Sequence, residues 1–282
     1  MALPVDPCEL IDDTSDSRVL IAAERGGIVT RFDVGDEPIL FMDIATLADS
    51  TKNVRGGIPV LFPSPGKLTE DAWTWGGHSG RLEQHGYARK SAWRIVPGSQ
   101  QTGRVTLRLD GAQDLAEAWP WLCTVDLEYS LVVRTLRIES RITNHGGTAM
   151  PFGFGLHPYF HVAQADKANA RVPTKATRAF DNITKQERAL NGPIDLTHKE
   201  VDLHLIDHGA SEAALVLSGR HIALRASPEF TRWVIWTLVD RDFVCLEPWT
   251  CPADALNTGE DLIVLAPGET RSLFVEIEVS QR

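Results

Sequence analysis

The chain has 282 residues, 43% of them hydrophobic, and 28 lysines and arginines against 38 aspartates and glutamates give a formal net charge of −10 at pH 7. We expect a globular protein with a sizeable core, because no run approaches the roughly 18 consecutive apolar residues that a membrane-spanning helix needs. The acidic balance argues against nucleic acid or an anionic membrane as partner, since both require clustered cations.

The start of the chain and its cysteines indicate a cytoplasmic protein. No basic segment followed by an apolar run begins the sequence, so we expect no secretion signal. Cys8, Cys123, Cys245 and Cys251 show no CxxC spacing, and free thiols are the default in a reducing compartment. A disulfide, or half of a metal site, at Cys245 and Cys251 is the alternative.

In chain order, the first segment with a clear signal is irregular. Residues 54–84 are rich in glycine, proline and tryptophan, and a loop of that length in a compact domain is uncommon and often functional. Its motif RGGIPVLFPSPG places Arg55 before paired glycines. A phosphate-binding loop is one interpretation, although P-loop spacing is absent. A rigid turn with a solvated Arg55 is the other.

The motif QHGYAR comes next. The glycine after His85 allows a second backbone segment or a ligand to approach closely. Taken alone, His85 is more often a structural hydrogen-bonding residue than a catalytic one. Lys67, Arg81, Arg89 and Lys90 lie near it in sequence and predict a small basic patch.

From residue 104 onward, hydrophobic residues recur with a period of two, which is typical of half-buried antiparallel strands. Turn-forming residues separate the runs. Short helices are predicted only at 112–119 and 184–192. The predicted strands are 104–111, 123–131, 136–142, 213–219, 221–227, 232–240 and 273–279.

Many strands with few helices predict an all-β protein built as a sandwich of antiparallel sheets. No linker-like, repeated or low-complexity segment interrupts the chain. We therefore expect a single domain over residues 1–282.

The motif FGFGLHPYFHV, residues 152–162, carries two histidines. His157, Tyr159 and His161 are expected on one strand face, and Pro158 predicts an edge or bend at which a side chain points into a cleft. One zinc ion cannot bind both histidines, because residues four apart in a strand lie roughly 13 Å apart.

Glu247 stands inside the apolar strand FVCLEPW. A carboxylate there is either paired or has a raised pKa, and both situations are common at functional sites. A structural ion pair with an arginine is the alternative. The motifs GxSxG, HExxH and GxGxxG are absent, and no second strand carboxylate suggests a glycosidase. One carboxylate with several histidines suits proton transfer.

Five motifs in this order, RGGIPVLFP, QHGYAR, WPW, GLHPYF and CLEPWTCPADALN with LAPGET, resemble the galactose mutarotase-like family of aldose 1-epimerases and hexose-6-phosphate mutarotases. The likeness runs from about residue 54 to 277. It implies a large antiparallel β supersandwich, no cofactor and no metal. It also implies interconversion of sugar anomers by acid–base ring opening and closure.

The resemblance assigns catalytic roles by matching motifs. His157 would protonate the ring oxygen, and Glu247 would take the proton of the anomeric hydroxyl. His85 would donate a hydrogen bond to the ring oxygen or to a neighbouring hydroxyl.

The resemblance also implies substrate-binding residues. Arg55 and Asp202 match residues that contact sugar hydroxyls. The rings of Trp73, Trp75 or Trp249 are candidates to stack on the sugar, with a core or loop position as the alternative for each.

Two substrates fit the motifs. QHGYAR resembles the hexose-6-phosphate branch, in which Arg55, Lys67, Arg81 and Arg89 would hold the phosphate. The C-terminal motifs resemble the aldose 1-epimerases of free sugars. We expect a free hexose, with a sugar phosphate as the alternative, acted on by a monomer or weak homo-oligomer. A non-catalytic carbohydrate-binding protein and a glycan-cleaving enzyme stay open.

Overall fold

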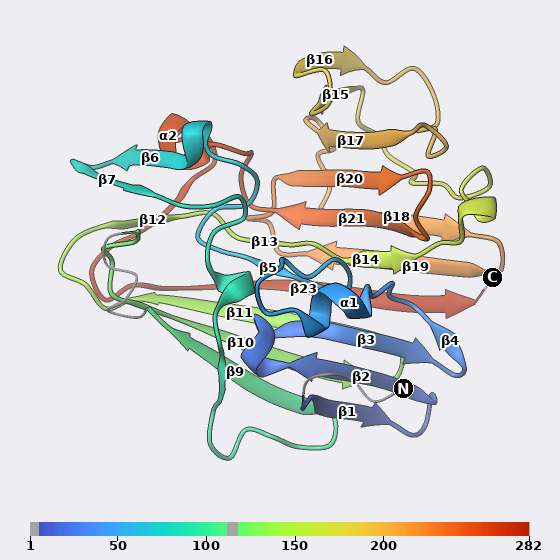
Figure 1. Ribbon diagram of the computed structural model, residues 1–282, viewed down its shortest axis with the longest axis horizontal. Coiled ribbons are helices and arrows are strands. Elements are labelled where there is room, and N and C mark those ends of the chain that lie inside the picture. The colour runs from blue at the N-terminus through green and yellow to red at the C-terminus, as the bar shows by residue number, and fades with distance from the viewer. Residues whose placement is uncertain (1–5, 112–117, 282) are drawn as a thin grey trace.

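The computed structural model describes residues 6–111 and 118–281. The predicted all-β class is confirmed: antiparallel sheets pack against one another as a large β supersandwich (Figure 1). None of the helices in the described parts is long and apolar enough to cross a membrane.

The largest sheet has eight strands, in the order β16-β15-β17-β20-β21-β13-β5, with β14 paired to β21. Its strands are β5 (Val60–Leu61), β13 (Gly155–Leu156), β14 (Tyr159–His161), β15 (Arg178–Asp181), β16 (Gln186–Ala189), β17 (Glu200–Leu205), β20 (Arg232–Leu238) and β21 (Phe243–Trp249).

A seven-stranded sheet has the order β18-β19-β23-β11-β10-β9-β8. Its strands are β8 (Arg94–Ile95), β9 (Arg104–Asp110), β10 (Cys123–Val132), β11 (Thr135–Asn144), β18 (Glu212–Leu217), β19 (Arg220–Ala226) and β23 (Thr270–Gln281).

The smaller elements surround these two sheets. A four-stranded N-terminal sheet contains β1 (Cys8–Asp12), β2 (Ser17–Ala22), β3 (Ile28–Val34) and β4 (Glu37–Pro38). Two further pairs are β6 (Ala72–Trp75) with β7 (His78–Arg81), and β12 (Met150–Phe152) with β22 (Ile263–Leu265). The helices are α1 (Ile44–Ala48), α2 (Ala255–Thr258) and the 3-10 turns η1 (Ala23–Arg25), η2 (Thr69–Asp71), η3 (Ala88–Lys90) and η5 (Gln164–Asp166).

The alternating sequence pattern builds the core of the seven-stranded sheet. Tyr129 lies opposite Ile138, and Leu136 lies opposite Ile277, so the apolar residues of three strands share one face. All four are buried. Full burial of a large apolar side chain is worth about 1.5–3 kcal/mol, so this shared face is a main source of stability.

The structure differs from the sequence prediction in several segments. The N-terminal sheet was not predicted, because β2 and β3 are buried on both faces and therefore lack alternation. The helix predicted at 184–192 is wrong, since strand β16 forms there and pairs with β15. Most of the helix predicted at 112–119 lies outside the described residues. The irregular segment 54–84 contains β5 and the β6–β7 hairpin.

Gly86 fixes the chain segment that carries His85. Its φ is +71°, and a Cβ there would lie 2.2 Å from the carbonyl oxygen of Phe62. The backbone N–H groups of Tyr87 and Ala88 both donate to that same oxygen, at 3.0 and 3.2 Å. The close approach explains the requirement for glycine in the His-Gly step.

We expect Gly86→Ala to lower the free energy of unfolding by about 3 kcal/mol or more, because a methyl group would overlap a backbone carbonyl. Gly98→Ala is the matched control: its φ is +76°, with nothing within 4 Å of the added Cβ, so only about 1–2 kcal/mol of backbone strain is expected. Denaturant unfolding of both variants measures the difference. Equal losses would show that the Phe62 carbonyl imposes no constraint.

Candidate active site

One face of the eight-stranded sheet forms the floor of a cavity of about 740 Å³. Side chains alternate along a strand, so every second residue of β21 points to this face. Glu247 lies opposite Val234 of β20, which lies opposite His204 of β17. On the next row, Trp236 lies opposite Asp202. The strand register therefore sets the relative positions of these side chains.

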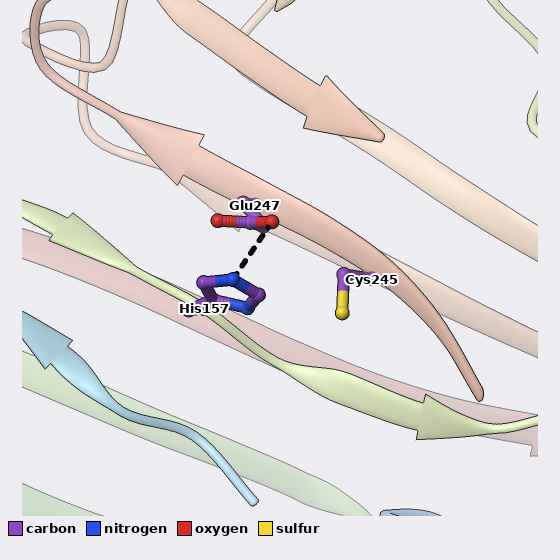
Figure 2. A group of neighbouring side chains, drawn as sticks. All are labelled: His157, Cys245 and Glu247. Atoms are coloured by element: carbon purple, nitrogen blue, oxygen red, sulfur yellow. Dashed lines mark ion pairs between the residues drawn. The ribbon is translucent and has the colours of Figure 1, made fainter. Parts of the chain in front are cut away.

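His157 reaches the floor from the connection between β13 and β14. The sequence predicted an edge or bend at Pro158, but the chain is only interrupted there: β13 ends at Leu156 and β14 begins at Tyr159, and both pair with β21 in one register, with Gly155 opposite Trp249 and Tyr159 opposite Cys245. The His157 ring stacks on the Tyr159 ring with centroids 4.6 Å apart. Its Nε2 atom lies 3.3 Å from Oε1 of Glu247 (Figure 2). An imidazole and a carboxyl group therefore face each other directly.

Burial disfavours the charged form of both groups. Glu247 is 1% exposed, and burial, reinforced by the negative charge of Asp202, raises its pKa well above the ordinary value. Burial, together with the positive charge of Arg89, lowers the pKa of His157 to about 3. Burial therefore favours the uncharged form of the pair, with the proton on the carboxyl group beside a neutral imidazole.

His85 is held as a neutral hydrogen-bond donor. Its Nδ1 atom accepts from the Gly66 N–H at 3.0 Å, and its own backbone N–H donates to the Gly66 carbonyl at 2.7 Å. The remaining proton of the neutral ring must then be on Nε2. Burial lowers the pKa of His85 well below its ordinary value. This ring is therefore suited to donating a hydrogen bond rather than to supplying a proton.

Two residues of the sheet, Trp249 and Asp202, influence the pair formed by His157 and Glu247. The indole N–H of Trp249 donates to Oε2 of Glu247 at 3.0 Å. Asp202 accepts a hydrogen bond from Nδ2 of Asn182 at 2.7 Å. The cavity also brings together all four residues that the sequence predicted for substrate binding, which are Arg55, Asp202, Arg89 and Trp249.

Other predicted positions lie elsewhere. Trp73 is buried against Trp119 and Trp121, so of the two alternatives predicted for it, stacking on a sugar or a core position, the structure shows the core position. Trp75 and His161 are not among the described residues that line the cavity.

The four cations of the predicted basic patch do not all lie at the cavity. The guanidinium group of Arg81 donates to the carbonyl of Glu70 at 2.8 Å, and Lys90 forms an ion pair with Glu83. Neither cation is among the described residues that line the cavity, whereas Arg89 and Lys67 are.

A family model described as aldose 1-epimerase matches residues 10–278 of the chain. This chain belongs to the aldose 1-epimerase family. Among solved structures, the Slr1438 protein of Synechocystis sp. PCC 6803 is 35% identical with a TM-score of 0.94, over 100% of this chain and 99% of that one. A galactose mutarotase-like protein from Lactobacillus casei, 20% identical over 98% of this chain and all of that one, has a TM-score of 0.79 and shares the fold.

One sequence relative of this epimerase-family chain bears a more specific name. The Cenchrus ciliaris protein named "Putative glucose-6-phosphate 1-epimerase" is 28% identical over 86% of this chain and 76% of its own length.

Sequence reasoning missed several cavity residues that come from the sheet floor. Glu200, Asp202 and His204 alternate along β17 and so share a face, which is a signal the sequence contains. Positions on other strands depend on pairing register and have no such local signal. The missed lining residues include Phe180, Asn182, Lys185, Glu187, Glu200, His204, Arg232, Val234 and Trp236.

The cysteines are free thiols in the structure, as predicted, and all four are buried. Cys245 lies beside the acid–base pair: donor atoms of His157, Cys245 and Glu247 all lie within 4.8 Å of one another (Figure 2). These three side chains have the donor types that hold a zinc-like cation.

A second hollow, of about 300 Å³, lies over the seven-stranded sheet. Its charges pair with one another: Arg225 contacts Glu212 at 3.1 Å and Glu276 at 3.5 Å. This hollow therefore offers fewer unpaired charged side chains to a ligand than the large cavity does.

We expect Glu247→Gln to raise the free energy of unfolding at pH 8 by about 1 kcal/mol or more. In the native protein the pKa of Glu247 is raised, so the unfolded state gains stability as pH rises and its carboxyl group ionises, at about 1.4 kcal/mol per pKa unit. The glutamine variant does not lose stability in this way as pH rises. The difference between its free energy of unfolding and that of the wild type should therefore shrink as pH falls from 8 to 5. The lowered pKa of His157 acts in both proteins and cancels to first order.

Glu200→Gln is the matched control, because exposed Glu200 also accepts an indole hydrogen bond, from Trp236 at 3.1 Å. Chemical unfolding of wild type and both variants at pH 5 and pH 8 provides the measurement. A Glu247→Gln advantage that does not change with pH, or that appears equally in Glu200→Gln, would show that burial does not hold the proton on Glu247.

Proposed function

We propose that this protein interconverts the α and β anomers of a free hexose. The reaction needs one group to protonate the ring oxygen and another to take the proton of the anomeric hydroxyl. Both oxygens are bonded to the same carbon, so the two groups must lie side by side. The observation that carries the proposal is the contact of 3.3 Å between His157 and Glu247 at the edge of a cavity of about 740 Å³.

The proton cycle follows from the chemistry of this pair. In ring opening, the His157 imidazolium gives its proton to the ring oxygen while the Glu247 carboxylate takes the proton of the anomeric hydroxyl. Opening leaves a neutral imidazole and a carboxylic acid, which is the protonation state that burial favours. After rotation about the C1–C2 bond, His157 takes the proton of the C5 hydroxyl as that oxygen attacks the other face of the carbonyl, and Glu247 gives its proton to the carbonyl oxygen, which restores the imidazolium and the carboxylate.

The pair carries one proton in either form, so no exchange with solvent is required between turnovers. Before opening, that proton must move from the carboxyl group to the imidazole across their direct contact. Arg89 opposes this transfer through its positive charge. Hydrogen bonds from the bound sugar to Glu247 would favour it, because they stabilise the carboxylate.

The surrounding side chains suit a polar, ring-shaped substrate. We assign His85 to donate a hydrogen bond to the ring oxygen or a neighbouring hydroxyl, and Arg55, Arg89 and Asp202 to contact hydroxyl groups. The Trp249 indole is assigned to hold the Glu247 carboxyl group through its hydrogen bond of 3.0 Å. It also borders the cavity, where its ring is available to the sugar.

Cavity charge supports a neutral sugar. The described lining residues include five cationic and six acidic side chains, so the cavity has no excess of positive charge. The cations are Arg55, Lys67, Arg89, Lys185 and Arg232, and the acids are Glu187, Glu200, Asp202, Glu247, Asp254 and Glu260. Arg232 is already paired with Glu260 and Asp261.

A hexose 6-phosphate is the second candidate. Arg55 and Lys67 are exposed residues of the cavity lining, where they can meet a phosphate group. The name of the Cenchrus ciliaris relative points the same way for that protein.

We expect Glu247→Gln and His157→Asn each to lower the mutarotation rate by a factor of about 10² or more, because each removes one proton-transfer group. Polarimetry of freshly dissolved α-glucose and α-galactose measures the rate. Glu276→Gln is the control: this carboxylate pairs with Arg137 on the other sheet, at 2.8 Å, and its variant should keep its activity.

A wild-type protein that binds sugar without hastening the change in rotation would be a carbohydrate-binding protein. Release of new reducing ends from a glycan would indicate cleavage instead. Near-normal turnover in Glu247→Gln would remove that residue from the mechanism.

We expect the KM values for glucose and galactose to be insensitive to salt. We also expect Lys67→Ala to change kcat/KM for glucose by about twofold at most. Both follow because a neutral sugar gains little from a screened surface charge. The measurement is the anomerisation rate over free and 6-phosphorylated hexoses at low and high ionic strength. A KM for glucose 6-phosphate well below that for glucose, raised by salt and by Lys67→Ala, would establish the phosphate substrate instead.

A further inference from the structure

We propose that His157, Cys245 and Glu247 form a binding site for one zinc-like divalent cation, which inhibits the enzyme by occupying its acid–base pair. The inhibition rests on the proposed function, whereas the binding of the cation does not. Cys245 has no role in the anomerisation as assigned above.

The donor atoms are close to the geometry that a tetrahedral cation needs. Zinc bonds of about 2.0 Å to nitrogen and oxygen and about 2.3 Å to sulfur place pairs of ligand atoms roughly 3.3–3.7 Å apart. Nε2 of His157 and Oε1 of Glu247 are already 3.3 Å apart. One ligand atom from each of the three residues lies within 4.8 Å of the other two, so closing the set needs a shift of about 1 Å at most, a movement within reach of a side-chain rotation.

The fold holds the three side chains on two adjoining segments. Cys245 and Glu247 are two residues apart on β21 and so point to the same face, while His157 comes from the segment that runs beside them (Figure 2). Tyr159 pairs with Cys245 across β14 and β21. Because all three donors are buried, little side-chain entropy would be lost when a cation binds.

Charge balance favours a dication at this place. A thiolate and a carboxylate would neutralise two positive charges, and the imidazole ligand is already neutral. Binding would release one proton from the Cys245 thiol and one from the Glu247 carboxyl group. Because both ligands must lose a proton to bind, affinity should increase with pH.

The donor set selects among cations. Thiolate and imidazole ligands suit Zn²⁺ and Cd²⁺, whereas Mg²⁺ and Ca²⁺ prefer oxygen ligands. His157 and Glu247 border the cavity, which gives the cation an entry path and leaves a fourth position toward the cavity. A cation bound there uses the same lone pairs that would exchange protons with the sugar.

The test uses the full chain, freed of metal with a chelator and titrated with Zn²⁺. Equilibrium dialysis without sugar is expected to find one bound zinc per chain. The mutarotation rate is expected to fall at least tenfold, to return when a chelator is added, and to be unaffected by Mg²⁺. Co²⁺ in place of Zn²⁺ should give the near-ultraviolet absorption of a thiolate–cobalt bond, which reports on Cys245 in the wild-type protein.

Cys245→Ala is the decisive variant, and it should weaken zinc binding at least tenfold while keeping the basal mutarotation rate. Cys251→Ala is the matched control, because this equally buried thiol is outside the three-residue set. Zinc bound as tightly by Cys245→Ala as by wild type, or no thiolate–cobalt absorption in wild type, would overturn the site.

The site and the activity can fail separately. Cys245-dependent zinc binding by a protein without mutarotation activity would support the site and reject the proposed function. An active enzyme that binds no zinc would reject the site alone.

Discussion

The structure depends on one unfavourable placement, which is a carboxyl group and an imidazole buried in contact, with Nε2 of His157 3.3 Å from Oε1 of Glu247. Either group alone would lose much of its hydration if it became charged. Together they can hold a single proton and remain neutral as a pair, while still presenting one donor and one acceptor. The hydrogen bond from Trp249 and the stacking of Tyr159 limit the ways in which the two can separate.

The antiparallel sheet and its connections contribute different halves of the cavity. Strand register places Glu247, His204 and Asp202 on a shared face, where a shift of one residue would turn each side chain to the opposite side. His85 and Arg55 come from connecting segments instead, and backbone contacts with neighbouring segments hold them, such as the two bonds between His85 and Gly66 and the bond from the Asp43 N–H to the Arg55 carbonyl. In the proposed reaction, the sheet determines where protons are exchanged. The connections are then free to determine which sugar is accepted, because loops tolerate change.

Sequence alone predicted the parts of this arrangement that have a local signal. Alternation identified six strands of the seven-stranded sheet, all except β8, and a carboxylate in an apolar strand identified Glu247. It failed where tertiary pairing overrides local preference: Gln186–Ala189 contains helix-favouring residues, yet it forms a strand because it pairs with β15. Trp73 was likewise a candidate for stacking on a sugar in the sequence. Only the packing of Trp119 and Trp121 against it shows that it belongs to the core.

The same geometry gives the site two competing chemistries. A group that accepts a proton from a sugar hydroxyl does so through a lone pair, and a lone pair held away from water is also a ligand for a cation. Two such donors bind a cation weakly, but a third one with a soft, ionisable sulfur supplies three of the four positions of a tetrahedral site. Cys245 fills a fully buried position among Tyr159 and Phe243, where a small apolar side chain would also pack. In the proposed cation site, the thiol is thus a third donor that neither packing nor proton transfer requires.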